Sequence, residues 1–263
     1  MTPSNSLILT GLADFPLVQP GEDLGTMIVR SLRHNQQPLM PGDIVVVAQK
    51  IVSKAEARLV VLDTITPSQE AEALAEETQK DPRVVELILR ESAAIARVRP
   101  GLIISEHRLG LVLANAGIDQ SNIDHSRGDS ALLLPEAPDA SADLLRETLQ
   151  DTYHVPIGVI INDSLGRPWR EGTAGHAIGY AGIHGLADQV GDDDLHGRAL
   201  TSTLVAWADE LAAAASFVMG QAAEARPVVL IRGAAIAVGG SGNFKELLRP
   251  ADKDLFKDWP RRT

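Results

Sequence analysis

Residues 159–172 read VIINDSLGRPWREG. The β-branched run Val159–Ile161 predicts a buried strand. The polar residues from Asn162 to Ser164, followed by a glycine and a proline, predict that the strand gives way there to a loop. Ligands of proteins that mix strands and helices often bind where a strand ends. The stretch therefore predicts both a core strand and a ligand site beside it.

The loop side of this stretch carries groups suited to anions and cations. Asp163 and Ser164 offer a carboxylate and a hydroxyl to a hard divalent cation. Arg167 and Arg170 add planar donor forks that match carboxylate or phosphate. Together they suggest phosphoryl chemistry. A capped turn with two surface arginines is the alternative interpretation.

The remaining pattern predicts an α+β fold of mixed sheets with packed helices. Strands are expected at 7–9, 44–48, 59–62 and 228–231, and helices at 23–33, 67–80, 81–92, 139–153 and 198–219. Three short strands between 95 and 113 resemble a meander. Strands and helices do not alternate regularly, which argues against a doubly wound sheet. We expect one domain over residues 1–263, which two intimately packed subdomains could form.

Composition excludes several classes of protein. The 263 residues are 44% hydrophobic, which favours a globular protein, and the net charge of −11 argues against a general nucleic-acid or membrane-surface binder. Without cysteine there is no disulfide, zinc–thiolate site or cysteine nucleophile. We see neither a signal peptide nor a run long enough to cross a bilayer, so we expect a cytoplasmic protein.

Two further segments resemble the first in placing polar groups after a strand. Asp119, in NAGIDQSN at 115–122, would be a second metal ligand with Asn122 beside it. Lys50 and Lys54 follow the strand at 44–48 and are plausible phosphate contacts, although the glycines of a P-loop are absent. The alternative for Asp119 and Asn122 is that they are only turn residues. The alternative for Lys50 and Lys54 is that they lie on a solvated strand end.

Several motifs, in order, resemble the coenzyme F420-0:L-glutamate ligases, the γ-glutamyl ligases that complete the F420 tail. They are GLADFPLV at 11–18, VSKAE at 52–56, NAGID with Ser121-Asn122, LLLP at 132–135, DSLGR at 163–167 and Met219-Gly220. Each motif is weak alone, whereas the ordered set is specific. The resemblance extends from about Leu7 to about Arg232.

The resemblance implies an activity. The family joins L-glutamate to the lactyl-phosphate tail of F420-0, adds further γ-linked glutamates in some members, and cleaves GTP to GDP and phosphate. It requires Mn²⁺ or Mg²⁺, is often assisted by K⁺, and forms homodimers with sites near the subunit interface. Some bacterial members carry a C-terminal flavin-binding domain, for which we expect no room in this chain.

The resemblance also implies site residues. Asp119 and Asp163 match ligands of one metal, Ser164 and Gln221 match ligands of a second, and Asp119, Asp163 and Lys54 are the predicted catalytic residues. The predicted nucleotide site comprises Phe15, Pro16, Leu17, Val18, Gln49, Lys50, Lys54, Asn122, Met219, Gly220, Gln221, Ala222, Ala223, Glu224, Ala225 and Arg226.

Three features depart from the family pattern. Gln49-Lys50 replaces a small hydroxylated pair, Ala57 replaces a glycine, and the Gln221 loop lacks the glycines of archaeal members. We expect an acyl phosphate, from which the glutamate amine displaces phosphate, with Glu56 or a metal-bound water as the general base. A related ligase with another acceptor and a non-catalytic F420- or nucleotide-binding protein are the alternatives.

Overall fold

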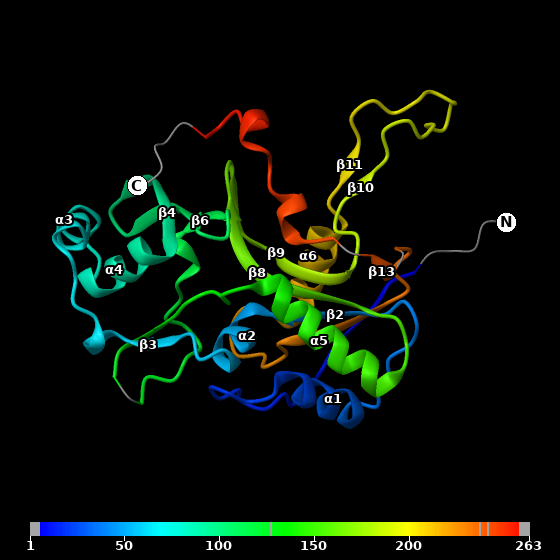
Figure 1. Cartoon of the computed structure of the whole chain (residues 1–263), viewed down its shortest axis with the longest axis horizontal. Coiled ribbons are helices and arrows are strands. Elements are labelled where there is room, and N and C mark those ends of the chain that lie inside the picture. The colour runs from blue at the N-terminus through cyan, green and yellow to red at the C-terminus, as the bar shows by residue number, and fades with distance from the viewer. Residues whose placement is uncertain (1–5, 127, 237, 241, 258–263) are drawn as a thin grey trace.

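A computed structural model describes residues 6–126, 128–236, 238–240 and 242–257. Within these residues the largest element is a six-stranded sheet of order β1–β12–β2–β8–β9–β13 (Figure 1). Its strands span Ile8–Gly11 (β1), Val228–Arg232 (β12), Ile44–Ala48 (β2), Gly158–Arg167 (β8), Arg170–Ile183 (β9) and Val238–Gly240 (β13). The sheet thus joins segments from both ends of the chain with segments from its middle.

The centre of the sheet is buried on both faces. β2 and β8 run parallel, with Val46 opposite Ile160, whereas the other neighbouring strands are antiparallel. Val45, Val46, Val159 and Ile160 are fully buried, which explains the unbroken β-branched runs. The mixed sheet with its packed helices confirms the predicted α+β class.

Four helices cover this sheet: α1 (Leu24–His34), α2 (Gln49–Ala55), α5 (Pro138–Tyr153) and α6 (Trp207–Met219). Figure 1 shows α5 in front of the sheet and α6 behind it. Both helices approach the glycines of β9 closely. A Cβ at Gly175 would lie 2.4 Å from the Ala212 carbonyl oxygen of α6, and one at Gly179 would lie 2.5 Å from the Pro138 carbonyl carbon of α5. Close backbone packing therefore accounts for these two glycines.

A second group of elements lies to the left in Figure 1. It contains α3 (Gln69–Thr78), α4 (Pro82–Glu91) and a three-stranded antiparallel sheet of β4 (Ser92–Arg99), β5 (Leu102–His107) and β6 (Val112–Ala114). The strands β3 (Leu59–Val61) and β7 (Ser130–Leu132) pair beside it, and the single turns Leu62–Thr64 and Asn115–Gly117 adjoin them. Val85, Ile88 and Ile103 belong to its own cluster of buried apolar side chains, separate from that of the large sheet.

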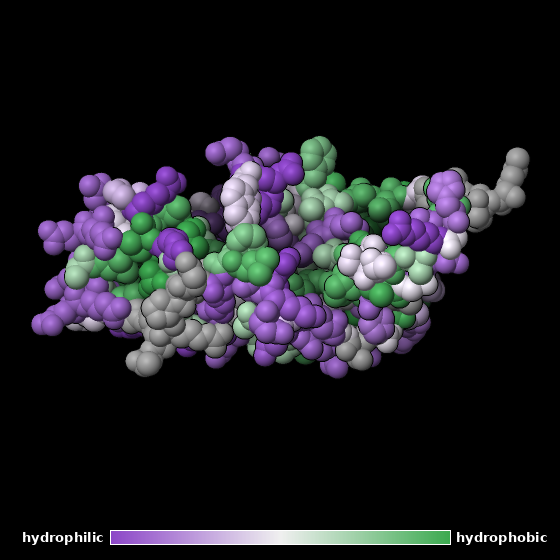
Figure 2. All heavy atoms as spheres, turned by 90° about the horizontal axis from the view of Figure 1, so that it is seen from above, coloured by the Kyte–Doolittle hydropathy of each residue, from purple (hydrophilic) through white to green (hydrophobic). Residues whose placement is uncertain are grey.

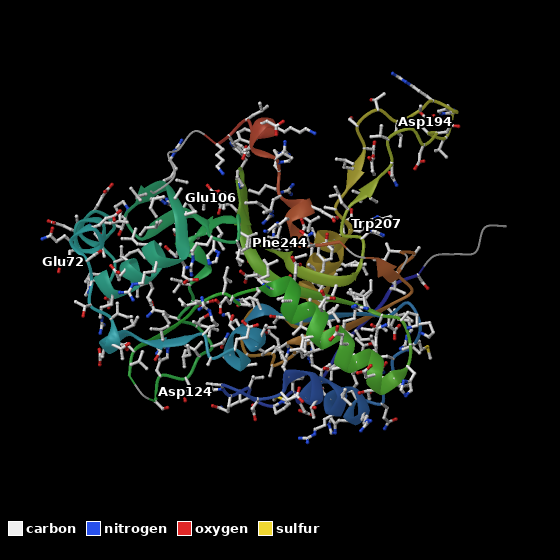
Figure 3. All side chains as sticks on the ribbon, in the orientation of Figure 1. Glu72, Glu106, Asp124, Asp194, Trp207 and Phe244 are labelled. Carbon is white, nitrogen blue, oxygen red and sulfur yellow. The ribbon has the colours of Figure 1, made fainter. Side chains whose placement is uncertain are left out.

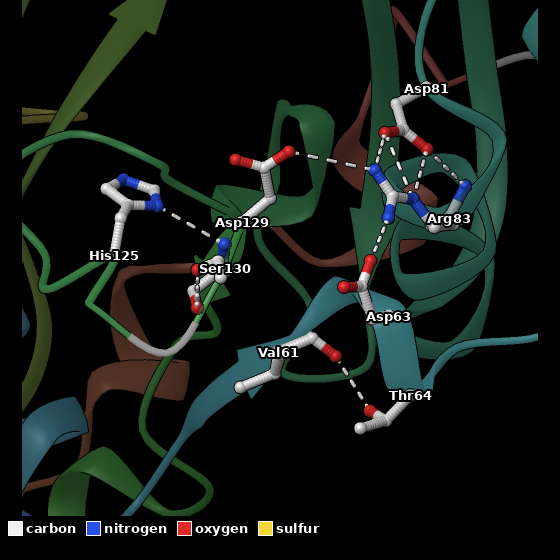
Figure 4. Close-up of polar contacts among 9 residues, drawn as sticks. Val61, Asp63, Thr64, Asp81, Arg83, His125, Asp129 and Ser130 are labelled. Atoms are coloured by element: carbon white, nitrogen blue, oxygen red, sulfur yellow. Dashed lines mark hydrogen bonds and ion pairs between the residues drawn. The ribbon is translucent and has the colours of Figure 1, made fainter.

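Ion pairs of Arg83 connect the elements of this second group to one another. The Arg83 guanidinium lies 2.6 Å from Asp63 Oδ1, 2.7 Å from Asp81 Oδ2 and 3.9 Å from Asp129 Oδ2 (Figure 4). It therefore links the start of α4 to the residue pair at one end of the β3–β7 ladder, where Asp63 follows β3 and Asp129 precedes β7. Asp81 also accepts a hydrogen bond from the Arg83 backbone N–H and thereby caps the start of α4.

Arg58 connects the two apolar clusters. Its Nη2 lies 2.8 Å from Glu91 Oε2 at the end of α4, and its Nε donates to the Leu134 carbonyl at 2.9 Å. Leu134 belongs to the cluster of the large sheet, whereas α4 supplies the second cluster. Glu91 is buried, and its Oε1 also forms an ion pair with Arg108 Nη2 at 2.6 Å.

Three predicted boundaries are wrong. β8 continues through Asp163 and Ser164 to Arg167, because its backbone pairs with β9 along that whole length. Residues 49–55 form helix α2 instead of a solvated strand end. The last long helix begins at Trp207 and not at Arg198.

The segment before Trp207 forms a projecting arm instead. Its strands β10 (Ala187–Asp188) and β11 (Leu204–Val205) pair near the sheet. Asp194 lies near the outer end of the arm (Figure 3), and its Oδ1 accepts hydrogen bonds from the backbone N–H groups of His196 and Arg198. Together with Asp192 and Asp193 it forms an exposed acidic turn. Among the described residues, no helix is long and apolar enough to cross a membrane.

Candidate active site

The first half of the candidate site joins α2 to the loop after β6. The Lys50 ammonium lies 2.7 Å from Asp119 Oδ2 and 2.9 Å from the Ser121 hydroxyl oxygen. The Ser121 backbone N–H donates to Asp119 Oδ1 at 2.7 Å. Burial opposes ionisation of Asp119, but the hydrogen bonds from Lys50 and Ser121 outweigh it and lower its pKa. Asp119 is therefore a fixed carboxylate.

Asp163, in the middle of β8, has the opposite electrostatic balance. Burial raises its pKa to about 6, and repulsion from Asp119 adds to this shift. The Ser164 N–H, which donates to Asp163 Oδ1 at 2.8 Å, favours the ionised form, as do Lys50 and the Gln49 amide. The structure thus brings Asp119 and Asp163 close enough to interact, and Lys50 is close enough to favour the charged form of both.

Lys54, one turn after Lys50 on α2, holds the adjoining loop. Its ammonium donates to the Asn122 carbonyl at 2.8 Å. Burial lowers the Lys54 pKa, and repulsion from Lys50 lowers it further. The Asn122 side-chain amide in turn donates to the Ala222 carbonyl at 3.2 Å. Residues predicted from three separate motifs therefore meet at one place.

The second predicted pair of metal ligands lies on the other face of β8. Side chains alternate along a strand, so Ser164 faces away from Asp163. Ser164 pairs with Gly175, whose backbone lies against Ser216 of α6. Gln221 reaches the same α6 residue, because its amide donates to the Ser216 hydroxyl at 3.1 Å. Ser164 and Gln221 thus share one side of the sheet, and Asp163 lies on the other.

The donor set fits hard divalent cations. Asp119 and Asp163 are neighbouring carboxylates that repel each other, and a cation between them would remove that repulsion. Among the described residues, no three side chains of the His, Asp and Glu types gather as a metal site. The remaining ligands would then be hydroxyl, amide, water or substrate phosphate oxygens, as Mg²⁺ and Mn²⁺ sites commonly use.

The predicted nucleotide residues divide by exposure. The side chains of Phe15, Val18 and Met219 are buried in the apolar cluster of the large sheet, so they pack in the core and are not exposed to a ligand. Pro16 and Leu17 are exposed, as are all residues from Gln221 to Arg226. Within that loop, Glu224 Oε2 accepts the Ala222 N–H at 2.8 Å.

Two predicted residues, Gln49 and Glu56, make contacts within the chain that the motifs do not indicate. Gln49 is buried, and its carbonyl oxygen accepts the Ser53 hydroxyl at 2.9 Å, which leaves its NH₂ group for Asp163. These contacts direct the Gln49 side chain toward Asp163. Glu56 accepts the Glu136 N–H at 3.1 Å and the Ser141 hydroxyl at the start of α5. Both of its oxygens accept hydrogen bonds there.

Ser53 and Ser121 contact the predicted site residues, although the motifs that contain them indicate no role for either. Ser121 follows Asp119 by two residues, and this Asp-x-Ser spacing is a known turn in which the carboxylate accepts the later N–H. That spacing could have revealed Ser121. Ser53 lies one helical turn after Gln49, which is the spacing of facing side chains only if the segment is a helix. The wrong assignment of residues 49–55 concealed it.

Fold and site together define an enzyme-like centre for anionic substrates, with paired carboxylates and two lysines at the end of a parallel strand pair. The family model described as F420-0:Gamma-glutamyl ligase matches residues 13–233. The chain therefore belongs to the F420-0:γ-glutamyl ligase family, which confirms the resemblance seen in the sequence.

Individual relatives cover almost the whole chain. A protein of Methanothermobacter thermautotrophicus named Coenzyme F420:L-glutamate ligase is 48% identical over 250 residues, 95% of this chain and 98% of its own. The protein of that name from Methanopyrus kandleri is 47% identical over 243 residues, 91% of this chain and 93% of its own. One from Archaeoglobus fulgidus is 36% identical over 242 residues, 92% of this chain and 93% of its own.

Proposed function

We propose that the protein joins L-glutamate to F420-0, once or repeatedly with γ-linkage after the first, at the expense of GTP. The observation that carries this proposal is the meeting of Lys50, Asp119 and Asp163 in one site. The names of the family and of the relatives support the substrates. We further propose a homodimer and assistance by K⁺.

The reaction needs an activated carboxylate, because amide formation from a carboxylate and an amine is unfavourable in water. In the first step, a carboxylate oxygen of F420-0 attacks the γ-phosphorus of GTP, and the bond to GDP breaks. In the second step, the glutamate α-amine attacks the acyl carbon, phosphate leaves, and the amine loses a proton. Both steps place negative charge on phosphate oxygens.

The chain's own groups can hold those charges. Lys54 and Lys50 place two ammonium groups beside the Asn122 and Ala222 segments, where we assign the GTP phosphates. Asp119 and Asp163 would hold a first Mn²⁺ or Mg²⁺, and Ser164 and Gln221 a second. Bound there, the cations supply charge neutralisation and orient phosphate oxygens. Gln49 keeps the Asp163 carboxylate oriented through its amide.

The test is incubation of the purified protein with F420-0, L-glutamate, GTP and Mn²⁺, followed by mass spectrometry. We expect a product heavier by one or more glutamyl units, with GDP formed in step. GTP cleavage without glutamylated product would indicate a different acceptor. Binding of F420-0 without GTP cleavage would instead support a non-catalytic binding protein.

A further inference from the structure

The end of the β8–β9 hairpin carries a conformationally unusual aromatic residue. Arg167 and Arg170 pair across the hairpin, so Pro168 and Trp169 make its turn. Trp169 has a φ of 58°, a left-handed conformation that favours glycine at such a turn position. Its side chain is nevertheless 80% exposed. A large ring held outward in a costly backbone conformation points to a contact outside the chain.

Trp169 and Phe256, with Arg167 and Arg170 beside them, form a surface that we call the aromatic platform. The Phe256 ring lies with its centroid 5.0 Å from that of Trp169, at a tilt of 60°. Lys257, the next residue, lies 2.8 Å from the buried carboxylate of Glu106, which fixes the C-terminal segment against β5. In Figure 1 this segment approaches the end of the hairpin. One face of Trp169 is therefore supported, and its exposed surface leaves the other face open.

The two guanidinium groups of the aromatic platform favour a negatively charged ligand. Arg167 and Arg170 lie directly opposite each other, and like charges in such a pair repel. Arg167 Nη1 donates a hydrogen bond to the Gly172 carbonyl oxygen at 3.0 Å, which leaves the other N–H groups of its guanidinium for a ligand. A phosphodiester between the two guanidinium groups would relieve the repulsion and accept their hydrogen bonds. Figure 2 looks onto this side of the molecule and shows apolar residues interspersed among polar ones.

One substrate of the proposed function carries the two groups that this site would bind. F420-0 joins a flat deazaflavin ring, through a ribityl chain and a phosphodiester, to a lactyl carboxylate. Its ring is suited to stacking on an aromatic side chain, and its phosphodiester is suited to a pair of guanidinium groups.

We propose that the ring of F420-0 stacks on Trp169, beside Phe256, while Arg167 and Arg170 bind its phosphodiester. This assignment rests on the proposed function. The guanine of GTP is a second flat ring that could stack, but the segments assigned to GTP lie elsewhere. In Figure 3, Asp124, close in sequence to Asn122, lies on the opposite side of the molecule from the end of the hairpin.

Binding is tested by equilibrium dialysis of F420-0 against the full chain, with and without GDP. Trp169→Ala should weaken F420-0 binding about 10-fold or more while leaving GDP binding unchanged, because a stacking contact is lost. Trp169→Phe should retain most of the affinity. Arg170→Gln should weaken binding about 10-fold and reduce its dependence on salt. Leu195→Ala, a fully exposed residue on the arm, is the matched control and should change nothing.

Trp169→Gly separates binding from folding. Glycine suits the positive φ, so this variant should keep the melting temperature of the wild type and still lose F420-0 affinity. Wild-type affinity in the alanine and glycine variants would overturn the subsite, even if the wild-type protein glutamylates F420-0. A loss of GDP affinity, or a change in oligomeric mass, would also overturn it. A wild-type protein that neither binds nor glutamylates F420-0 would refute the proposed function itself.

Discussion

The Lys50 ammonium lies 2.7 Å from Asp119 Oδ2, where a cation bound to that carboxylate would also lie. Lys50 therefore neutralises Asp119 and competes with any metal for it. Replacing Lys50 by Gln should raise the affinity of the site for Mn²⁺ by about 10-fold, since one competing positive charge disappears. It should also weaken GTP binding. Mn²⁺ titration followed by electron paramagnetic resonance measures the first effect, with exposed Lys253→Gln as the control. Unchanged or weaker Mn²⁺ binding would show that Lys50 does not compete.

Asp163 gives a second prediction because burial and Asp119 both oppose its charge. Asp163→Asn keeps an oxygen for the Ser164 N–H but loses the charge. Turnover should fall by about 1,000-fold or more if the carboxylate holds a catalytic metal. The fold should remain intact or become slightly more stable, because a buried repulsion is removed. Product formation and thermal unfolding are measured together, and Asp192→Asn in the exposed acidic turn is the matched control. Near-normal turnover would exclude Asp163 from the site.

Glu86 predicts how stability depends on pH. Hydrogen bonds from the Ser68 hydroxyl and N–H, together with Arg90, lower its pKa from 4.5 to about 2. Because the folded value is the lower one, Glu86 contributes stability that is fully present above about pH 4.5 and is lost as the pH falls toward 2. Glu86→Gln should cost about 1.5–3 kcal/mol at pH 7 and less at pH 3.

Urea unfolding at both pH values measures this difference, with exposed Glu72→Gln on α3 as the control. Equal destabilisation by Glu86→Gln at both pH values would show that its charge plays no part.

The Arg58–Glu91 pair predicts the strength of the connection between the two apolar clusters. Arg58→Met leaves a buried carboxylate with one partner fewer and should destabilise the protein by about 3 kcal/mol. The double variant Arg58→Met with Glu91→Leu should recover part of that loss, because no buried charge then lacks its partner. The midpoints of urea unfolding test both statements. An additive loss in the double variant would mean that the two side chains do not interact energetically.

The buried strands and most helices could be predicted because their signals are local. The runs at 44–47, 159–161 and 228–231 bury every side chain, and Ser68 and Asp81 cap their helices as their positions predict. The extension of β8 to Arg167 could not be predicted, because its polar residues have weak strand propensity and are held by pairing with β9. Helix α2 was missed for a similar reason: its seven residues fold against an existing core.

The motifs name residues that the structure brings together, but they do not indicate the contacts between them. Motifs indicate Asp119, Asp163 and Lys54. The structure brings Asp119 and Asp163 close enough to interact, and the Lys54 ammonium binds the loop at Asn122. That Lys50 binds Asp119, and that Gln49 turns inward toward Asp163, depends on how α2 leaves β2. Such a direction is set by packing and has no signature in the sequence.

The parallel pairing of β2 and β8 has a consequence for biosynthesis of the protein. During translation β2 leaves the ribosome long before β8 exists, and α3, α4 and the small sheet are made between them. Loop closure over so long a connection is slow, so this pairing is expected late in folding. Lys50 follows β2 directly, and Asp163 lies within β8, so the two cannot approach before that pairing forms. A nascent or partly unfolded chain would then lack a complete site, and ligand binding would report that the whole chain has folded.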